Sequence, residues 1–173
     1  MDGLRIVAEL MAVAARTAPK SGGIDDIEIK ILAGTDVTRL GDEMAAYGER
    51  NNLKKFDRDG ANVKAAGAVM LIGLKKAKPL GLNCGACGFA ECKELTEAPQ
   101  ADVQFAGPHC AYKLLDFGIA LGSAVKTASI MNADNRIMYR IGPVAREMKL
   151  MDADVIMGIP LSATGKNIFF DRK

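Results

Sequence analysis

Residues 67–74 read GAVMLIGL, an uninterrupted apolar run that ends in the basic sequence Lys75-Lys76-Ala77-Lys78-Pro79. A short apolar run bounded by a charged loop is typical of an interior strand that is buried on both faces. A second run of this kind, ADVIMGI at residues 153–159, predicts another buried strand, which we expect Pro160 to stop. The two runs together predict a sheet that is covered on both sides.

Helical patterns and one further strand pattern surround these two runs. Ile27, Ile29 and Ile31 alternate with charged residues, the period of a half-buried strand. The predicted helices, which carry apolar residues at helical spacing, cover residues 3–16, 37–47, 111–131 and 137–151. The polar residues 49–60 predict a loop or a frayed helix end.

Because helices and strands interleave without a repeat or a linker, we expect one domain over residues 1–173. The predicted fold class is α+β (α/β-like), a mixed sheet flanked by helices, with a cysteine-rich insertion at residues 81–110 that binds a cluster.

Composition excludes several classes of protein. The 173 residues are 49% hydrophobic and 25% charged, an ordinary globular balance, so the fold does not depend on metal or disulfide crosslinks. A net charge of +2 is too small to indicate nucleic acid as a partner. The first twenty residues lack the apolar core of a signal peptide, and the best candidate span, residues 117–131, is too short and contains Lys126. We therefore expect a cytoplasmic protein without a membrane partner, in which thiols stay reduced.

The four cysteines of the chain form one constellation. Cys84, Cys87, Cys92 and Cys110 follow the spacing C-x2-C-x4-C-x17-C. Three thiols within nine residues can surround one face of a compact centre while a distant fourth closes it, and iron–sulfur clusters are commonly held by four cysteine thiolates. Gly85 and Gly88 permit the positive φ angles that turn backbone N–H groups toward sulfur. The sequence thus predicts an iron–sulfur centre with these four metal ligands.

Three other interpretations use the same cysteines. A structural zinc site commonly pairs two C-x2-C knuckles, whereas this chain has one, with Cys92 close beside it. A disulfide framework disagrees with the length of the chain and the expected compartment. Four unrelated buried cysteines are the remaining interpretation.

The cysteine segment also resembles a known module. GLNCGACGFAEC at residues 81–92, together with Cys110, is similar to the four-cysteine module of corrinoid iron–sulfur proteins and of the B subunit of Rnf-type electron-transport complexes. That resemblance covers about thirty residues and implies a [4Fe–4S] cluster, because spacing by itself does not separate two-iron from four-iron clusters.

A wider resemblance covers nearly the whole chain. Segments such as ARTAPKSGGID (15–25), DFGIALGSAVKTA (116–128) and GIPLSATGKNIFFDRK (158–173) resemble an uncharacterised family of ferredoxin-domain-containing proteins. More remotely, the layout is similar to that of nitroreductase-like flavoproteins, which implies a homodimer with FMN at its interface. The chain is short for that family, and the cysteine insertion is not part of its ordinary pattern.

Two polar stretches are tentative FMN or anion sites. The flavoprotein resemblance implies that Arg16, Thr17 and Lys20 lie near a flavin phosphate, although these residues also suit a solvated helix end. Lys166 and Asn167 belong to a small polar stretch able to surround an anion or simply to form a turn. That stretch is not a P-loop, because Pro160 stands where the first glycine is required.

The expected function is electron transfer, or a small oxidoreductase reaction, with a redox partner protein. The alternative is a zinc or redox-sensing module that binds a partner without catalysis. Neither a general acid–base pair nor a nucleophile motif stands out in the sequence, so no catalytic residue is predicted.

Overall fold

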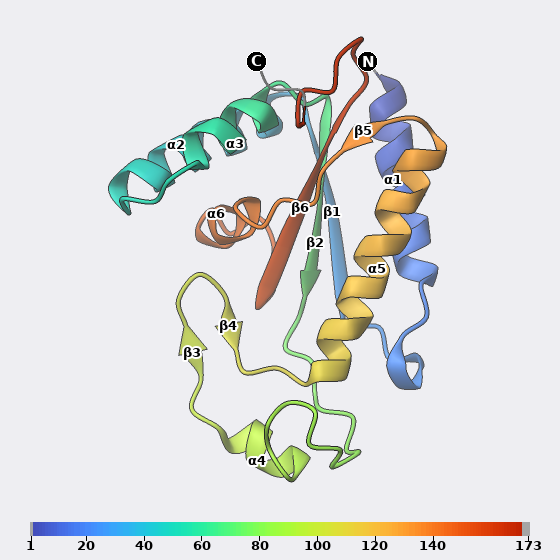
Figure 1. Cartoon of the computed structure of the whole chain (residues 1–173), viewed down its shortest axis with the longest axis vertical. Coiled ribbons are helices and arrows are strands. Elements are labelled where there is room, and N and C mark those ends of the chain that lie inside the picture. Colours follow the sequence, from blue (N-terminus) through green and yellow to red (C-terminus); the bar gives the residue numbers. More distant parts are fainter. Residues whose placement is uncertain (1, 171–173) are drawn as a thin grey trace.

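The computed structural model describes residues 2–170 and places one sheet between two layers of helices (Figure 1). The sheet has the strand order β1-β2-β6-β5, and each of the three pairings is antiparallel. The strands are β1 (Ile27–Ala33), β2 (Ala68–Leu74), β6 (Val155–Ser162) and the short β5 (Asp134–Asn135). The predicted class, a sheet flanked by helices, is confirmed, but the sheet formed by residues 2–170 is antiparallel rather than mixed.

Strand β2 is the centre of the fold because both of its faces are buried. Successive side chains of a strand point to opposite faces, and here each face meets a different layer of helices. Met70 and Ile72 pack on one side, against α1 (Asp2–Thr17) and α5 (Ala111–Ile130). Val69 and Leu71 pack on the other side, against α2 (Thr35–Arg50), α3 (Phe56–Lys64) and α6 (Ile141–Glu147). The apolar run GAVMLIGL thus holds the two halves of the core together.

The cysteine-rich segment projects from one end of this sheet, between β2 and α5 (Figure 1). It contains the short helix α4 (Cys92–Glu97) and a two-stranded hairpin, β3 (Ala101–Asp102) with β4 (Ala106–Gly107). The remaining regular element is a 3-10 turn, η1 (Ser21–Gly23), between α1 and β1. The end of the sheet that bears the segment is therefore the place where the four cysteines are presented.

Two local predictions were wrong. Residues 49–60 do not form a single loop, because helix α3 begins at Phe56, and its buried Phe56 and Val63 pack in the core. Strand β6 also continues through Pro160 to Ser162. Gly158 exchanges both backbone hydrogen bonds with Met138, on the edge of β6 that faces away from β2. Backbone groups two residues apart in a strand point to the same edge, so the nitrogen of Pro160 also faces that edge. At that edge β5 pairs only with residues 161 and 162, so no ladder bond is lost at Pro160.

Among residues 2–170, no helix is both long enough and apolar enough to cross a membrane.

The contact between α6 and β6 yields a stability prediction. A Cβ on Gly142 would lie 1.9 Å from the carbonyl oxygen of Ile156 and 2.7 Å from the Phe105 ring. Moving the backbone of β6 to make room for this Cβ would be energetically costly. Gly142→Ala should therefore lower the free energy of unfolding by about 3 kcal/mol, measured by urea denaturation. Gly3→Ala is the control, since a Cβ at that helical glycine meets nothing within 4 Å. Equal stability of the two variants would contradict the described packing.

Candidate metal centre

All four cysteines border one small cavity, in the segment that projects from the sheet. The cavity has an empty volume of about 300 Å³, including the open space at its mouth. Its lining consists of the four cysteines and of Leu80, Leu82, Asn83, Gly85, Ala86, Phe89, Ala111 and Tyr112. The chain therefore brings Cys110 to the same site as the three cysteines that lie about twenty residues earlier.

Left-handed backbone conformations shape the loop that carries the first three cysteines. Gly85 and Gly88 have φ angles of 72° and 89°, a region that glycine enters without steric cost. The Gly88 N–H donates to the Gly85 carbonyl at 2.9 Å and closes a tight turn around Cys87. The predicted positive φ angles at both glycines are confirmed.

Asn83 closes the same loop by binding its far end. Its own φ is 47°, a left-handed conformation that asparagine tolerates better than most residues. The Asn83 side-chain oxygen accepts a hydrogen bond from the Cys92 N–H at 2.8 Å, and the Asn83 N–H lies 3.4 Å from the Cys92 sulfur. This contact directs a backbone N–H group at the Cys92 sulfur. This role of Asn83 was missed from the sequence, although an asparagine directly before a cysteine in a turn is a usable signal.

Cys110 is more deeply buried than the other three cysteines. Its residue is 5% exposed and it occupies the N-cap position of α5, where its carbonyl accepts bonds from the N–H groups of Lys113 and Leu114. Cys87 and Cys92 are half-buried and Cys84 is exposed. The fourth cysteine is therefore buried with the core residues, while the first three lie on a surface loop.

Buried polar contacts fix the first turns of α5, whose N-cap residue is Cys110. The Lys113 side chain is almost fully buried, and its ammonium lies 2.7 Å from the Asp26 carboxylate. Asp116 accepts hydrogen bonds from the N–H and the hydroxyl of Ser21. These contacts tie the start of α5 to the segment around η1, so the backbone of Cys110 has little freedom to move.

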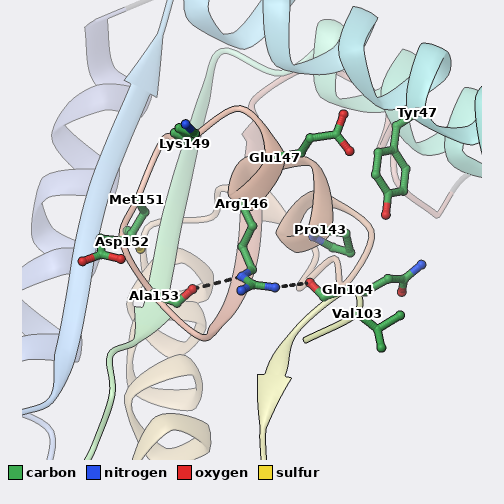
Figure 2. A pocket seen from close by; sticks show the side chains of 10 residues that line it. All are labelled: Tyr47, Val103, Gln104, Pro143, Arg146, Glu147, Lys149, Met151, Asp152 and Ala153. Atoms are coloured by element: carbon green, nitrogen blue, oxygen red, sulfur yellow. Dashed lines mark hydrogen bonds between the residues drawn. The ribbon is translucent and has the colours of Figure 1, made fainter. Parts of the chain in front are cut away.

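A second cavity lies where the β3–β4 hairpin meets the body of the protein, and Arg146 crosses its wall (Figure 2). The guanidinium donates to the carbonyl oxygens of Ala153 at 3.2 Å and Gln104 at 3.0 Å, and it pairs with Asp102 at 2.9 Å. Burial, and then the charge of Glu147, raise the pKa of the neighbouring Tyr47. This region anchors the hairpin that leads into Cys110.

The residues His109 and Pro108 complete the approach to Cys110. His109 Nε2 lies 2.6 Å from the Ala106 carbonyl, and the Gly107–Pro108 peptide bond is cis. The half-buried His109 therefore has a hydrogen-bond partner within the hairpin.

The side chains of the four cysteines are free thiols, so the structure contains no disulfide framework among them. Within residues 2–170, no three His, Cys, Asp or Glu side chains are placed so that they could hold one metal ion. The four thiols therefore border one cavity without converging on one ion position.

Arg16, which was predicted to lie at an FMN or anion site, forms hydrogen bonds within the chain. Its Nη1 donates to the Asp25 carboxylate at 2.6 Å and to the Ile27 carbonyl at 2.7 Å. Burial opposes ionisation of Asp25, but hydrogen bonds from Arg16 and the Ile27 N–H, with the charges of Arg16 and Lys20, outweigh it and hold the pKa of Asp25 below its ordinary value. Arg16 is half-exposed and orders the turn after α1.

Thr17 and Lys20 also stabilise the end of α1. The Thr17 hydroxyl donates to the Val13 carbonyl at 3.0 Å. The Lys20 ammonium donates to the carbonyls of Ala15, Arg16 and Ala18 at 2.8–3.0 Å. A buried lysine with three such partners has used its three donors, so Lys20 serves as a cap for the helix.

Lys166 and Asn167 lie at the other end of the sheet, in the segment that follows β6 and runs beside the start of α1 (Figure 1). The Asn167 amide donates to Asp134 at 2.9 Å, and its oxygen accepts the N–H groups of Phe169 and Phe170. Lys166 is exposed. Within one chain, therefore, these two residues are not brought together with Arg16, Thr17 and Lys20.

The buried pair at the start of α5 gives a second prediction. Lys113→Met removes one partner of a buried ion pair and leaves the Asp26 carboxylate uncompensated, so the free energy of unfolding should fall by about 3 kcal/mol. Lys126→Met changes an exposed lysine of the same helix and should stay within about 0.5 kcal/mol of the parent. Urea denaturation of both variants measures the difference. An equal effect at the two positions would show that Lys113 does not fix this helix.

Comparison with known proteins adds sequence and fold relationships. The family model described as "Uncharacterized protein containing a ferredoxin domain" matches residues 106–172. A relative from Archaeoglobus fulgidus, described as an uncharacterised protein, is 46% identical over 171 residues, which covers 99% of this chain and 92% of the relative.

Several solved structures share the fold at low sequence identity. The FMN-dependent nitroreductase NfnB from Mycobacterium smegmatis, in complex with NADPH, superimposes with a TM-score of 0.63 at 8% identity, over 93% of this chain and 78% of that one. The nitroreductase CinD from Lactococcus lactis gives a TM-score of 0.60 at 18% identity, over 96% and 84%. A nitroreductase with bound FMN from Desulfitobacterium hafniense gives 0.58 at 11% identity, over 92% and 78%. These likenesses establish a nitroreductase-like fold.

Proposed function

This chain belongs to the family of uncharacterised proteins that contain a ferredoxin domain, and from that premise we propose that it binds one [4Fe–4S] cluster and acts in electron transfer. The proposed ligands are Cys84, Cys87, Cys92 and Cys110. The observation that carries the proposal is the single cavity bordered by all four thiols. The choice of a four-iron cluster follows from the resemblance of residues 81–92 to known four-iron modules.

The chain's own residues are suited to hold a negatively charged centre. Cys110 would provide a rigid buried ligand, and the loop of Cys84, Cys87 and Cys92 would close over the other side. The N–H group of Asn83, directed at the Cys92 sulfur, would stabilise charge on that ligand. When bound, such a cluster exchanges single electrons, and the protein sets its potential through hydrogen bonds to sulfur and through exposure. The exposed Cys84 marks the side from which a redox partner protein would approach.

The main alternative is a zinc site that orders residues 81–110 for binding a partner. It is disfavoured because structural zinc sites commonly pair two C-x2-C knuckles, whereas this chain has one. Both readings need thiols that stay reduced, and we propose a cytoplasmic location for that reason.

Replacing single cysteines tests the ligand set. We expect Cys84→Ser, Cys87→Ser, Cys92→Ser and Cys110→Ser each to lose most of the iron and acid-labile sulfide of anaerobically purified protein, which in the parent should approach about four of each per chain. Ala86→Ser is the matched control, because it adds a hydroxyl to the same cavity and keeps all four thiols. Stoichiometric zinc in iron-replete preparations of the parent, or full iron retention by the Cys110 variant, would refute the proposal.

A second candidate function adds a flavin. The solved structures with this fold include FMN-dependent nitroreductases, and the helices α1 and α5 of this chain expose apolar side chains. Ile6, Leu10 and Val13 lie at helical spacing on α1, and Leu115 and Ile119 do so on α5. We infer that these faces join two copies in a homodimer, and that FMN binds between them near Arg16.

Association and flavin binding should therefore change together. Leu115→Glu places a charge on the exposed face of α5 and should shift sedimentation from dimer to monomer and weaken FMN binding at least tenfold. Val103→Glu is the control, since Val103 is 85% exposed on the β3–β4 hairpin, away from that face. A parent protein that sediments as a monomer and binds no FMN at saturating concentration would exclude this second function.

A further inference from the structure

A separate cavity also borders Cys110, between the end of the sheet and the cysteine-rich segment. Its empty volume is about 860 Å³, including open space at the mouth. Three connections form its walls: the chain leaving β2 at residues 76–79, helix α4 with the residues that follow it, and the chain entering α5 at residues 108–110. Cys110 borders both cavities. A molecule in this cavity would therefore touch a proposed cluster ligand.

Asp154 is the unusual residue of this cavity. It is only 9% exposed, and its side chain forms no hydrogen bond or ion pair with any residue in the described range 2–170. Its backbone is fixed, because its N–H donates to Leu74 and its carbonyl accepts the Ala106 N–H, each near 3 Å. Most of the residue is buried, and a carboxylate without a partner in the protein keeps its acceptor oxygens free for a ligand. Here the carboxylate lines the cavity and has acceptor capacity to offer.

The charges and walls of the cavity select a class of ligand. Lys76 and Lys78 are exposed lysines that line it, and neither forms an ion pair within residues 2–170. The two ammonium groups favour an anionic group on that side of the cavity, and a monoanion meets less repulsion from Asp154 and the proposed cluster than a doubly charged phosphate. Pro79, Leu95 and other apolar residues supply the rest of the wall. Apolar walls with a few polar groups are typical of sites for small organic molecules.

We propose that this cavity binds a small organic monocarboxylate with a compact apolar body and a hydroxyl or amino group. The carboxylate would pair with Lys76 and Lys78, and the hydroxyl or amino group would donate a hydrogen bond to Asp154. The site lies beside Cys110, so its role as a substrate or effector site rests on the proposed cluster function. Binding of the acid itself does not require that function.

Benzoate and benzyl alcohol test the charge requirement, because they share an apolar body and differ in the carboxylate. Calorimetry of the anaerobically purified full chain should give at least tenfold tighter binding of benzoate. The double variant Lys76→Ala/Lys78→Ala should weaken benzoate about tenfold. Lys75→Ala is the matched control, since Lys75 belongs to the same basic run, pairs with Glu28 and does not line the cavity. Equal binding of both probes, or an equal loss in the control, would overturn the proposal.

The three hydroxybenzoate isomers test Asp154. At least one isomer should bind more tightly than benzoate to the parent protein, and this preference should disappear in Asp154→Ala, which removes the acceptor. The same variant should bind plain benzoate more tightly, because a negative charge facing the ligand is removed. A preference that survives in Asp154→Ala, or a parent protein that prefers no isomer, would show that Asp154 does not face the ligand.

The reduction potential tests the contact with Cys110. A centre that gains negative charge on reduction must bind a neighbouring anion more weakly, and linkage then requires saturating benzoate to lower the midpoint potential. A tenfold ratio of affinities corresponds to about 59 mV for a one-electron couple. An unchanged potential with confirmed binding would contradict a site beside Cys110. Lysine-dependent benzoate binding in protein that lacks iron and sulfide would instead refute the cluster and leave the anion site standing.

Discussion

The position of Cys110 is the constraint on which the candidate site depends. Its backbone begins α5, and the first turns of that helix are tied to the core through the Lys113–Asp26 ion pair and the Asp116–Ser21 hydrogen bonds. A buried thiol fixed in this way gives the surface loop of three cysteines a rigid counterpart. Without Cys110, the loop would carry three thiols but could not enclose a centre.

The architecture separates the two tasks of folding and of presenting the cysteines. The sheet and its two helical layers bury the apolar residues, with β2 in contact with both layers. The cysteine-rich segment contributes little to that core, apart from Phe105, which packs against it, and the buried Leu95. Arg146 holds the β3–β4 hairpin against the body of the protein (Figure 2), and the Tyr139 hydroxyl adds a hydrogen bond to Gln104. A fold shared with flavoproteins can therefore carry a cysteine-rich insertion without rearranging its core.

The elements that are visible in the sequence are those with a strong local signal. The apolar run 67–74 and the small-residue helix 111–131 are long or continuous enough to be recognised alone, and both are present. Helix α3 was missed because its sequence does not show apolar residues at helical spacing. Its stability comes from tertiary contacts, among them the close packing of Gly60 on Gly41. The end of β6 was predicted wrongly at Pro160 for a similar reason. A strand can contain a proline where the proline nitrogen faces an unpaired edge, and only the tertiary structure shows which edge that is.

The candidate site shows the same division between sequence and structure. The cysteine spacing identifies four residues that share a cavity, because metal ligation leaves a pattern of residue types. The neighbouring cavity leaves no such pattern: Asp154 and Lys76 are 78 positions apart, and only the antiparallel pairing of β2 with β6 places them at the same end of the sheet. Lys20 is the opposite case, a basic residue that suggests a phosphate site in the sequence and caps a helix in the structure.

Iron K-edge X-ray absorption of protein isolated and kept under anaerobic conditions tests the central claim most directly. The account predicts iron surrounded by sulfur alone, with neighbouring iron atoms at short range, and a loss of that signal in Cys110→Ser. Iron ligated mainly by nitrogen or oxygen, or iron with no iron neighbour, would contradict a cluster held by the four cysteines.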